Sequence, residues 1–501
     1  MRCLTLAELL QGRGADARFV CRAHGGNLNE LLHERKFPVS ALPSPRSATI
    51  SAIDGDYATW LGVAQGEDAE QTIAVLEDSR PDWLIVDHYG LDAVWERLMR
   101  PHAHRLMVIS DLANRPHDCD VLLNQNYYNE VLEQYAGLVP DGCRLMLGPR
   151  YALLRPEFEQ RRRTKEKRDG RVRRVFVFFG GTDQGDVTGL ALDALCDPEF
   201  AALEVDVVVG ANNARRQTLE KKISTRQRTR LYGRMPRLAE LMAEADLAIG
   251  AGGGTTWERM CVGVPSVVVS IAENQEPACK ALSESGLIRY LGPDSHVGTR
   301  VIRDELRKCL AEPASLAEIS ARGQLMVDGL GAGRIAEFLD PTPAQSLRLR
   351  PANAGDAGHY FHWVNDPVVR RQSLRSEPID FAEHQSWFAK KVAARQTRLF
   401  VMEAGELPVG QIRFDREGAE TRIDYSIDPL FRGRGWAKSA LALGLQEMRR
   451  EGATIFRADV KESNPVSCAV FRKLGFSESS STAGSGIRVF RLDATARRRE
   501  A

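Results

Sequence analysis

Short apolar runs alternate with amphipathic helical stretches over the first two thirds of the chain. Runs typical of buried strands lie at residues 17–22, 83–87, 105–111, 175–179, 205–209, 247–250 and 266–271. A helix is predicted at residues 1–12, and another carries Leu28, Leu31 and Leu32. Because strands that alternate with helices form βαβ units, we predict parallel sheets whose ligands bind beyond the carboxyl ends of the strands.

The pattern changes after residues 339–346, a proline-containing segment that we interpret as a linker. Beyond it, mostly antiparallel strands are predicted at residues 399–404, 409–414 and 421–427, with Gly405–Pro408 as a hairpin turn. A helix that opens at residues 432–437, a strand at 454–460 and a helix at 465–474 complete the pattern. This order predicts a separate α+β domain over residues 347–493.

The length of 501 residues allows about two to four domains. We divide the chain into an α/β lobe at residues 1–160, a second α/β lobe at 161–338, the linker at 339–346 and the α+β domain at 347–493. The basic run at residues 161–174 is better explained as a solvated crossing between lobes than as a nucleic-acid site. Two such lobes with glycine turns facing one cleft are typical of a GT-B-like architecture, which suits a nucleotide-sugar ligand.

Composition and charge exclude several classes of partner. The net charge is +1, which gives no reason to expect nucleic acid or an acidic membrane surface. The nine cysteines are an odd number without a C-x-x-C pair, which favours a reduced, cytoplasmic protein. We see no apolar run near the length of a membrane span and no metal-site pattern. The sequence leaves the oligomeric state open.

The stretch from Leu247 to Pro265 is the centre of the predicted chemistry in the second lobe. A short strand is followed by Gly252, Gly253 and Gly254, and a helix begins near Trp257, for which Thr255 and Thr256 offer an N-cap. A strand, a glycine turn and a helix start together can bind an anion through unpaired backbone N–H groups. The alternative is that the glycines serve packing alone.

The C-terminal domain carries a more specific pair of motifs. The loop Arg432-Gly433-Arg434-Gly435-Trp436-Ala437 follows a strand and opens a helix, so its amides can hold a pyrophosphate. Asn464 begins a second segment, Asn-Pro-Val-Ser-Cys-Ala-Val-Phe471, before Gly475. Together these motifs resemble those of the GNAT acetyltransferases.

That resemblance implies acetyl-CoA as co-substrate, bound between two splayed strands with its pyrophosphate on residues 432–437. Asn464 would hold the pantetheine arm or neighbouring backbone. The family often has tyrosine at the position of Phe471, where its hydroxyl protonates the departing thiolate; phenylalanine cannot do this. Asp424 and Tyr425 are candidate base or orienting residues, of which alternating strand geometry lets only one face the cleft.

The segment His362–Arg370, His-Trp-Val-Asn-Asp-Pro-Val-Val-Arg, resembles a subgroup of GNAT enzymes that acetylate amino sugars or protein N-termini. Two interpretations stay open. The segment is either an amphipathic helix with a proline stop or a direct substrate contact.

The first 338 residues resemble the UDP-sugar hydrolases of pseudaminic acid biosynthesis, which are related to the GT-B transferase that makes lipid II. The motifs that carry the resemblance are residues 87–90 (Asp-His-Tyr-Gly), 117–120, 148–155, 180–183 (Gly-Gly-Thr-Asp), 250–258 and 274–276. These hydrolases remove UDP from UDP-2,4-diacetamido-2,4,6-trideoxy-β-L-altrose.

By that resemblance, Gly252, Gly253, Gly254 and Thr255 would hold the diphosphate and Glu258 the ribose hydroxyls. Tyr89 and Asn274 would contact the reacting sugar and its water, and Gln275 would add to the UDP-sugar site. The alternative for Glu258 is an ordinary first-turn glutamate favoured by the helix dipole. His88 is expected to be a packing or hydrogen-bonding residue.

One departure concerns the catalytic histidine of the family. The hydrolases begin with a strand and Gly-x-Gly-His-x-x-Arg-x-Leu-x-Leu-Ala, and residues 2–7 of this chain align with the end of that motif. Met1 falls two residues after the position of the histidine. We expect that the start codon was placed too late; the alternative is a polypeptide without the hydrolase chemistry. His24 is not expected to replace the histidine.

These observations predict a bifunctional enzyme that acetylates the 4-amine of a UDP-amino-sugar and then hydrolyses the product to UDP and free sugar. Two alternatives remain. The lobes form a glycosyltransferase that uses a sugar or lipid acceptor, or they form a hydrolase-dead UDP-sugar-binding module attached to an active acetyltransferase.

Overall fold

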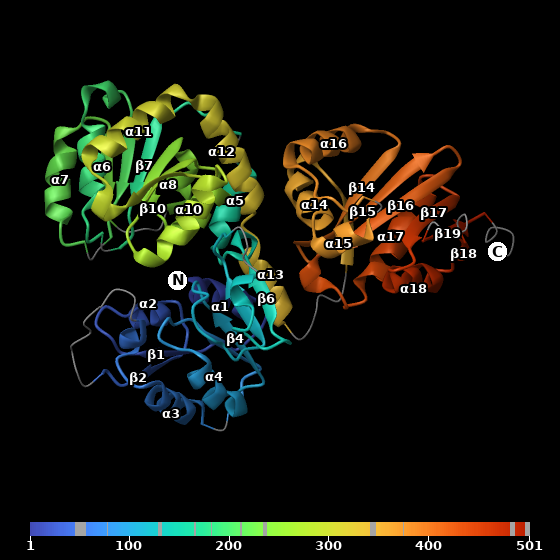
Figure 1. Ribbon diagram of the computed structural model, residues 1–501, viewed down its shortest axis with the longest axis horizontal. Helices are drawn as coiled ribbons and strands as arrows, with labels where there is room; N and C mark the ends of the chain where they lie inside the picture. Colours follow the sequence, from blue (N-terminus) through green and yellow to red (C-terminus); the bar gives the residue numbers. More distant parts are fainter. Residues whose placement is uncertain are drawn as a thin grey trace. The chain divides into compact units, whose positions relative to one another are not determined.

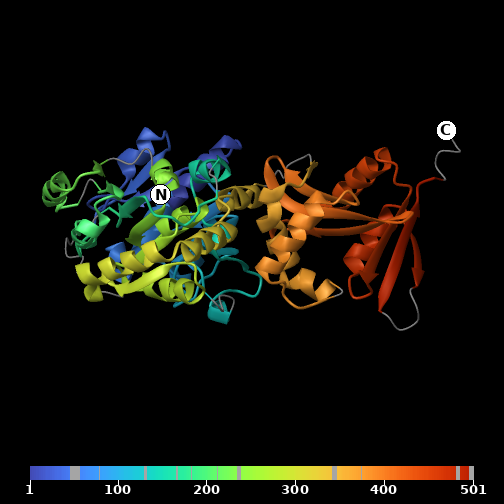
Figure 2. The same cartoon turned by 90° about the horizontal axis from the view of Figure 1, so that it is seen from above.

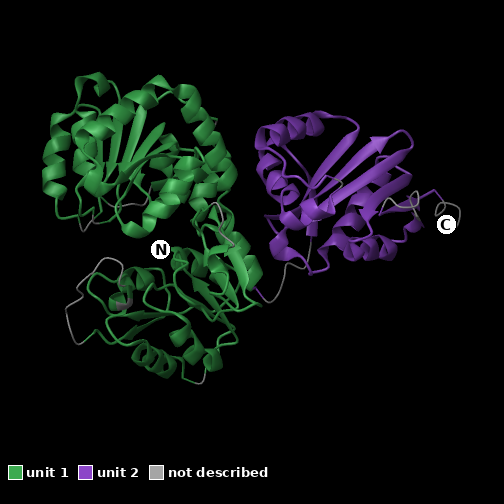
Figure 3. Ribbon diagram, in the orientation of Figure 1, with its two compact units in different colours: residues 1–339 green, residues 340–501 purple. Residues whose placement is uncertain are grey.

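The computed structural model describes residues 1–45, 57–77, 79–128, 133–164, 167–181, 183–210, 213–233, 238–340, 347–373, 375–480 and 486–495. It divides into two compact units, Met1–Leu339 and Asp340–Ala501 (Figure 3). Residues 341–346 of the predicted linker and Thr182 of the predicted glycine turn lie outside the described residues.

The first lobe of unit 1 contains two parallel sheets. Strands β1 (Phe19–Arg22) and β2 (Val39–Leu42) form one, and β3 (Trp83–Val86), β4 (Arg105–Ile109), β5 (Val121–Asn124) and β6 (Arg144–Leu147) form the other in that order. Its helices are α1 (Arg2–Gly12), α2 (Asn29–Glu34), α3 (Gln65–Leu76) and α4 (Ala93–Met99), with short 3₁₀ turns η1 (Tyr57–Leu61), η2 (Arg100–His102), η3 (Glu133–Tyr135) and η4 (Pro149–Tyr151). The predicted parallel sheets are therefore confirmed here.

The second lobe is a six-stranded parallel sheet in the order β12-β11-β10-β7-β8-β9. Its strands are β7 (Arg174–Phe178), β8 (Glu204–Val208), β9 (Thr229–Tyr232), β10 (Leu247–Ala251), β11 (Ser266–Ser270) and β12 (Arg289–Pro293). The chain starts in the middle at β7, moves outward to β9, and returns to the other side at β10. Ligands in such sheets bind where the strand order reverses, which is beyond the carboxyl ends of β7 and β10.

Helices cover both faces of this sheet (Figures 1 and 2). Because strand side chains alternate, Val175 and Val177 of β7 enter one core while Phe176 and Phe178 enter the other. The first core includes side chains of α6 (Val187–Leu195), α7 (Arg216–Thr225), α11 (Thr299–Ala311) and α12 (Pro313–Met326). The second includes side chains of α5 (Pro156–Thr164), α8 (Leu238–Glu244), α9 (Thr255–Cys261) and α10 (Glu276–Glu284). Two buried faces explain why these strands are apolar throughout.

The last helix of unit 1 returns to the first lobe. Helix α13 (Gly331–Leu339) packs against α1 (Figure 1), and the Trp83 indole Nε1–H donates to the Leu339 carbonyl oxygen at 3.0 Å. The lobes also meet where the Tyr127 and Ser285 hydroxyls lie 3.0 Å apart.

The basic run at residues 161–174 has a structural role. Arg168 donates through Nε to the Gly263 carbonyl at 2.6 Å and through Nη2 to the Ala243 carbonyl at 2.9 Å. These carbonyls follow α9 and lie at the end of α8, where helix geometry leaves acceptors without partners. Arg168 thus joins two helix ends, and Arg174 already belongs to β7.

Unit 2 contains one seven-stranded sheet in the order β13-β14-β15-β16-β17-β19-β18. Its strands are β13 (Leu347–Pro351), β14 (Thr397–Ala404), β15 (Leu407–Glu417), β16 (Glu420–Ile427), β17 (Ile455–Lys461), β18 (Ser477–Ser480) and β19 (Ile487–Asp493). Its helices are α14 (Ala357–Val364), α15 (Pro367–Gln372), α16 (Phe381–Ala393), α17 (Trp436–Arg450) and α18 (Pro465–Lys473), with 3₁₀ turns η8 (Ala354–Asp356) and η9 (Pro429–Phe431). The predicted α+β pattern is confirmed.

The strands β16 and β17 diverge within this sheet. They pair in parallel only from Glu420 to Arg422, opposite residues 455–457, although both continue for several residues beyond. The separated carboxyl ends leave backbone groups of both strands available to a ligand. This splay agrees with the one that the resemblance to the GNAT family implies.

The predicted hairpin turn at Gly405–Pro408 was too long. Leu407 and Pro408 already pair with β14, so the turn is Gly405-Glu406, with Gly405 at φ +61°. A two-residue turn of this kind favours glycine at positive φ. The register shifts beside Pro408, and such an irregularity accommodates a residue without a backbone N–H.

Candidate functional site

Two glycine turns flank the reversal point of the second-lobe sheet. Gly180 and Gly181 follow β7, and Gly252–Gly254 follow β10. The start of α6, beyond the first turn, is already occupied: the Asp183 carboxylate accepts the backbone N–H groups of Val187 and Thr188, each at 3.0 Å. The turn at residues 252–255 has no such carboxylate, so of the two it is the one open to an anionic ligand.

The structure corrects the predicted cap of α9. The helix begins at Thr255 rather than near Trp257, its N-cap is Gly254, and no side chain caps it. The hydroxyl of Thr256 instead donates to the Ala251 carbonyl at 3.4 Å, and that of Thr255 accepts from Arg259. Both threonines therefore stabilise the turn through contacts on its buried side.

The three glycines differ in what requires them. A Cβ on Gly252 would lie 2.2 Å from the Cys279 sulfur, so Gly252 is required by packing. A Cβ on Gly254 would meet nothing within 4 Å, and one on Gly253 would only approach the Gln275 amide at 3.5 Å. The packing alternative thus explains Gly252, whereas Gly253 and Gly254 leave open space in front of the backbone.

Glu258, in the first turn of α9, lies close to the motif at residues 148–155. Arg155 Nη2 is 3.7 Å from Glu258 Oε1, and Oε2 is enclosed without a hydrogen bond in the described structure. Burial raises the pKa of Glu258 to about 7, against the opposing effect of Arg155. An unpartnered carboxylate oxygen here can accept ligand hydroxyl groups.

Asn274 and Gln275 lie in the 3₁₀ turn η6 (Glu273–Gln275), after β11. Gln275 Oε1 accepts the Ile271 backbone N–H at 3.1 Å, which places the side chain beside Gly252 and Gly253. Gln275 therefore helps to shape the glycine turn, and η6 brings Asn274 to the same end of the sheet.

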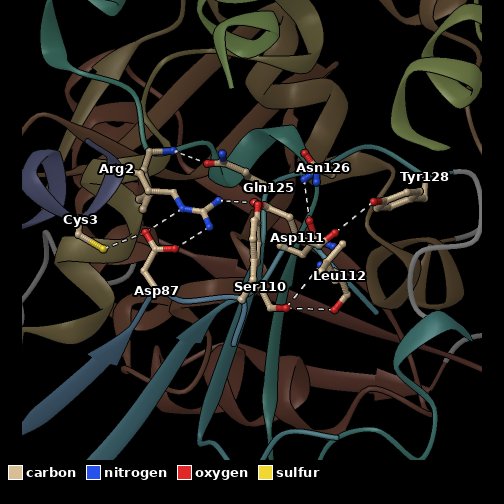
Figure 4. Close-up of polar contacts among 12 residues, drawn as sticks. Arg2, Cys3, Asp87, Ser110, Asp111, Leu112, Gln125, Asn126 and Tyr128 are labelled. Atoms are coloured by element: carbon tan, nitrogen blue, oxygen red, sulfur yellow. Dashed lines mark hydrogen bonds and ion pairs between the residues drawn. The ribbon is translucent and has the colours of Figure 1, made fainter. Parts of the chain in front are cut away.

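A polar cluster occupies the carboxyl ends of β3 and β4 in the first lobe (Figure 4). Arg2 donates to both oxygens of Asp87, at 3.0 and 2.7 Å, and to Asp111 Oδ2 at 2.7 Å. Burial acts to raise the pKa of Asp87, but the hydrogen bonds and charge of Arg2 outweigh it and hold the pKa below its usual value. Asp87 is thus ionised, and Arg2 holds its carboxylate in one geometry.

Tyr89 belongs to this cluster. Its hydroxyl donates to Asp111 Oδ2 at 2.6 Å, and burial together with the Asp111 charge raises its pKa. Asp111 Oδ1 is buried and has no hydrogen-bond partner in the described part of the chain. The Tyr89 hydroxyl oxygen and Asp111 Oδ1 can therefore both accept from a sugar hydroxyl, an amide or a water molecule.

Arg2 and Asp111 were not predicted as site residues. The signal for Asp111 was present, since it directly follows an apolar strand, as Asp87 does. Arg2 could not be found in this way, because its partners lie 85 and 109 residues away in sequence.

Two histidines of the matched motifs have local roles. His88 Nδ1 accepts the Gly90 backbone N–H at 2.9 Å, and burial lowers its pKa. His117 Nδ1 lies 2.7 Å from the Glu96 carboxylate in the protein interior. The prediction that His88 is a hydrogen-bonding residue agrees with its position.

In unit 2, the loop at residues 432–437 connects η9 to α17. Gly433 and Gly435 have φ of +86° and +78°, and a Cβ on either would meet nothing within 4 Å. Left-handed glycines turn successive N–H groups toward the same side, which is the arrangement that binds a phosphate group. Arg434 lies over the rings of Phe431 and Trp436, with Cζ 5.3 Å from each centroid.

The segment His362–Arg370 supports this loop. Asp366 accepts from Arg432 Nη2 at 2.6 Å, and the buried Trp363 indole donates to the Asp428 carboxylate at 2.9 Å. Asp428 in turn caps η9 by accepting the Leu430 N–H. These contacts favour the structural interpretation of the segment for Trp363 and Asp366.

Asn464 and Tyr425 lie on the α18 side of the diverging strands. Asn464 Oδ1 accepts the Ser467 N–H at 3.1 Å, so it holds neighbouring backbone. The Tyr425 hydroxyl is 2.9 Å from the Ser467 hydroxyl, and the Tyr425 ring contacts the ring of Phe471. Asp424 points the other way, where it accepts from the Gln411 amide at 2.9 Å. Of the two candidates, Tyr425 is therefore the one beside the Phe471 position.

No cluster of three or more metal-ligating side chains is present among the residues that the structure describes. None of the described helices is both long enough and apolar enough to span a membrane.

Comparison with known proteins finds a family match for unit 2 and distant relatives for unit 1. Residues 346–477 match the model of the acetyltransferase (GNAT) domain, which confirms that unit 2 has a GNAT fold. The spermidine N-acetyltransferase of Vibrio cholerae in complex with CoA and spermine is 20% identical over 29% of this chain and 93% of its own, with a TM-score of 0.27.

The N-terminal region resembles a UDP-sugar hydrolase and a polysaccharide biosynthesis protein. The UDP-2,4-diacetamido-2,4,6-trideoxy-beta-L-altropyranose hydrolase of Campylobacter jejuni is 27% identical over 44% of this chain and 77% of its own length. The spore coat polysaccharide biosynthesis protein SpsG of Bacillus subtilis is 26% identical over 42% of this chain and 62% of its own. An uncharacterised protein of Methanocaldococcus jannaschii is 21% identical over 89% of this chain and 91% of its own, so that similarity spans both units.

Proposed function

We propose that this chain carries out two consecutive reactions on a UDP-linked amino sugar. Unit 2 transfers an acetyl group from acetyl-CoA to a sugar amine, and unit 1 hydrolyses the acetylated UDP-sugar to UDP and free sugar. The observation that carries the proposal is the substrate of the C. jejuni relative, which bears two acetamido groups. An acetamido group is the product of amine acetylation, and a GNAT domain is fused to the similar region.

The acetyl transfer follows from the geometry of unit 2. The pyrophosphate of acetyl-CoA would lie on the amides of residues 432–437, and its acyl arm between the diverging strands β16 and β17. The amine nitrogen forms a bond to the thioester carbon and loses one proton to solvent, the C–S bond breaks, and the thiolate takes up a proton. Tyr425 is the proposed proton donor, because it lies beside Phe471 and burial raises its pKa, which keeps the hydroxyl protonated.

The hydrolysis would use both lobes of unit 1. The diphosphate would bind at residues 252–255 and the ribose hydroxyls at Glu258, while Tyr89 and Asn274 contact the sugar and its water. Water attacks the anomeric carbon, and the bond from that carbon to the β-phosphate oxygen breaks to release UDP. Charge on the departing diphosphate is stabilised by backbone N–H groups of the turn.

A glycosyltransferase is the second candidate for unit 1, because the same UDP site would serve an acceptor other than water. The third is a binding module that presents the UDP-sugar to unit 2 without turnover. An assay of UDP release with and without added sugar or lipid acceptor separates the three. We expect release without an acceptor; release that needs one identifies a transferase, and retained UDP-sugar with no release identifies a binding module.

In this assay CoA and UDP are followed separately, with the Glu258→Gln variant as the unit 1 control. We expect CoA release by the wild-type chain and by the variant. The absence of CoA release with any UDP-4-amino-sugar would contradict the proposed acetyl transfer.

A further inference from the structure

A guanidinium group is buried directly behind the glycine turn of the second lobe. Arg259, on α9, is 0% exposed. Its Nη2 donates to the Ala251 carbonyl at 2.8 Å and to the Thr256 hydroxyl at 3.1 Å, and Nη1 donates to the Thr255 hydroxyl at 3.1 Å. Its Nε donates to the Ser266 hydroxyl at 3.0 Å. Arg259 therefore holds the residues on either side of Gly252–Gly254.

The charge of Arg259 has no paired carboxylate, unlike those of the other buried arginines of unit 1. Arg22 donates to the Asp68 carboxylate, and Arg334 donates to that of Asp328. In the described structure each hydrogen-bond acceptor of Arg259 is a neutral oxygen. Glu258 acts on it only through space, and its own raised pKa reduces that effect. A buried charge without a partner is costly, so such a residue indicates a site where an anion completes the charge balance.

The backbone beside Arg259 leaves room for its guanidinium group. A Cβ on Gly250, in β10, would lie 2.6 Å from Arg259 Nη1 and 2.7 Å from the Phe178 carbonyl oxygen. Glycine at position 250 therefore leaves the space that the guanidinium occupies. An apolar side chain at position 259 would have avoided the desolvation of a charged group.

We propose that Arg259 is a positioning residue that fixes the turn at residues 252–255 and supplies the buried positive charge that a bound diphosphate neutralises. The proposal rests on the proposed UDP-sugar function of unit 1. The guanidinium lies behind the turn and does not touch the ligand in this arrangement. Its field acts through a dry region, where a charge has a stronger effect than it has in water. Arg259 therefore strengthens the binding of the diphosphate and does not affect the binding of the nucleoside.

The test compares UDP with uridine as ligands of the full chain and of the Arg259→Met and Arg259→Lys variants, by isothermal titration calorimetry. Methionine keeps the volume without the charge, and lysine keeps the charge without the fork of donors. We expect UDP affinity to fall at least about tenfold in Arg259→Met, with the affinity for uridine unchanged and with Arg259→Lys in between. Thermal unfolding shows that each variant is folded, and Arg259→Lys remains informative if Arg259→Met is not.

Three outcomes of this titration would overturn the role of Arg259. A ratio of UDP to uridine affinity that is the same in the wild type and both variants would overturn the role of Arg259 and leave the proposed function intact. Equal losses of UDP and uridine affinity would also overturn it, because they indicate collapse of the whole site. If the wild-type chain binds neither ligand, both the proposed function of unit 1 and the role of Arg259 are wrong.

Discussion

At the scale of the residue, several groups of unit 1 are held in states that folding alone would not favour. Glu258 is a carboxyl group whose ionisation burial opposes, and Asp111 keeps one oxygen buried without a partner. Each costs stability in the free protein. Such residues are typical of binding sites, because a ligand can supply what the protein lacks.

The raised pKa of Glu258 makes the free energy of unfolding depend on pH. Its pKa is about 7 in the folded chain, against 4.5 for an unperturbed carboxyl. Between these values the folded chain holds a proton that the unfolded chain has lost, so the contribution of Glu258 to stability falls as the pH rises through this window. We expect Glu258→Gln to be more stable than the wild type at pH 8 by about 1–3 kcal/mol, and equal to it at pH 4.5. Denaturant unfolding at both pH values measures this, and an equal difference at both would contradict it.

The proton donor of unit 2 gives a second prediction. Tyr425→Phe removes the proposed donor, and we expect kcat for CoA release to fall about tenfold to a thousandfold with little change in KM for acetyl-CoA. Phe471→Tyr restores a hydroxyl beside the same position. The double variant should recover part of the lost rate, whereas no loss in Tyr425→Phe would exclude this tyrosine as donor.

Site residues differed in how far the sequence could predict them. Gly433 and Gly435 were predictable because a local motif places them, and their positive φ follows from local geometry. Arg2 and Arg259 depend on contacts with distant segments or on burial that no local pattern encodes, whereas Asp111 was missed although it follows an apolar strand. The roles of Tyr89 and Glu258 came from the resemblance to the hydrolases, and they remain predictions.

At the scale of the element, the helices that follow glycine turns differ in whether a side chain binds their first N–H groups. Asp183 fills the start of α6, while the turns before α9 and α17 have no side-chain cap. Uncapped N–H groups are available to a ligand, so the glycine turns before α9 and α17 can accept a phosphate group. The sequence predicted the glycine turns but not this difference, because Thr255 and Thr256 looked like capping residues and instead bond to Arg259 and Ala251.

The buried strands β7, β10 and β11 were predicted to within a few residues, because their continuous apolar runs are short and bounded by turn residues. Strand β5 is also buried at all four residues, but it was not predicted. The error at Gly405–Pro408 arose because proline was assigned to the turn, whereas it occupies an irregular position in β15. The order of strands in the sheets could not be predicted from periodicity.

The support of the loop at residues 432–437 leads to a third prediction. Asp366→Ala removes the carboxylate that holds Arg432, and the loop loses a contact that fixes its position. We expect KM for acetyl-CoA to rise about tenfold while affinity for UDP stays unchanged. Asp380→Ala is the matched control: Asp366 caps α15 and Asp380 caps α16, but the described hydrogen bonds of the Asp380 carboxylate go only to backbone N–H groups of its own helix. Equal effects of the two substitutions would show only a general loss of stability.

At the scale of the whole molecule, each unit contains its own core and its own candidate site. Unit 1 has the glycine turn at residues 252–255 and the cluster of Arg2, Asp87 and Asp111, and unit 2 has the loop before α17. The similarity to the M. jannaschii protein spans both units, so their fusion is not unique to this chain. The proposed consecutive reactions would explain such a fusion, because the product of unit 2 would then be the substrate of unit 1.

The most direct measurement follows the products formed from a UDP-4-amino-sugar and acetyl-CoA over time by mass spectrometry. We predict that the chain first forms the N-acetylated UDP-sugar and then converts it to UDP and free acetylated sugar without any acceptor. Omission of acetyl-CoA should prevent the first product and slow UDP release. Two results would contradict the two-step function: UDP release from the amino-sugar that is equally fast without acetyl-CoA, or the absence of any acetylated product.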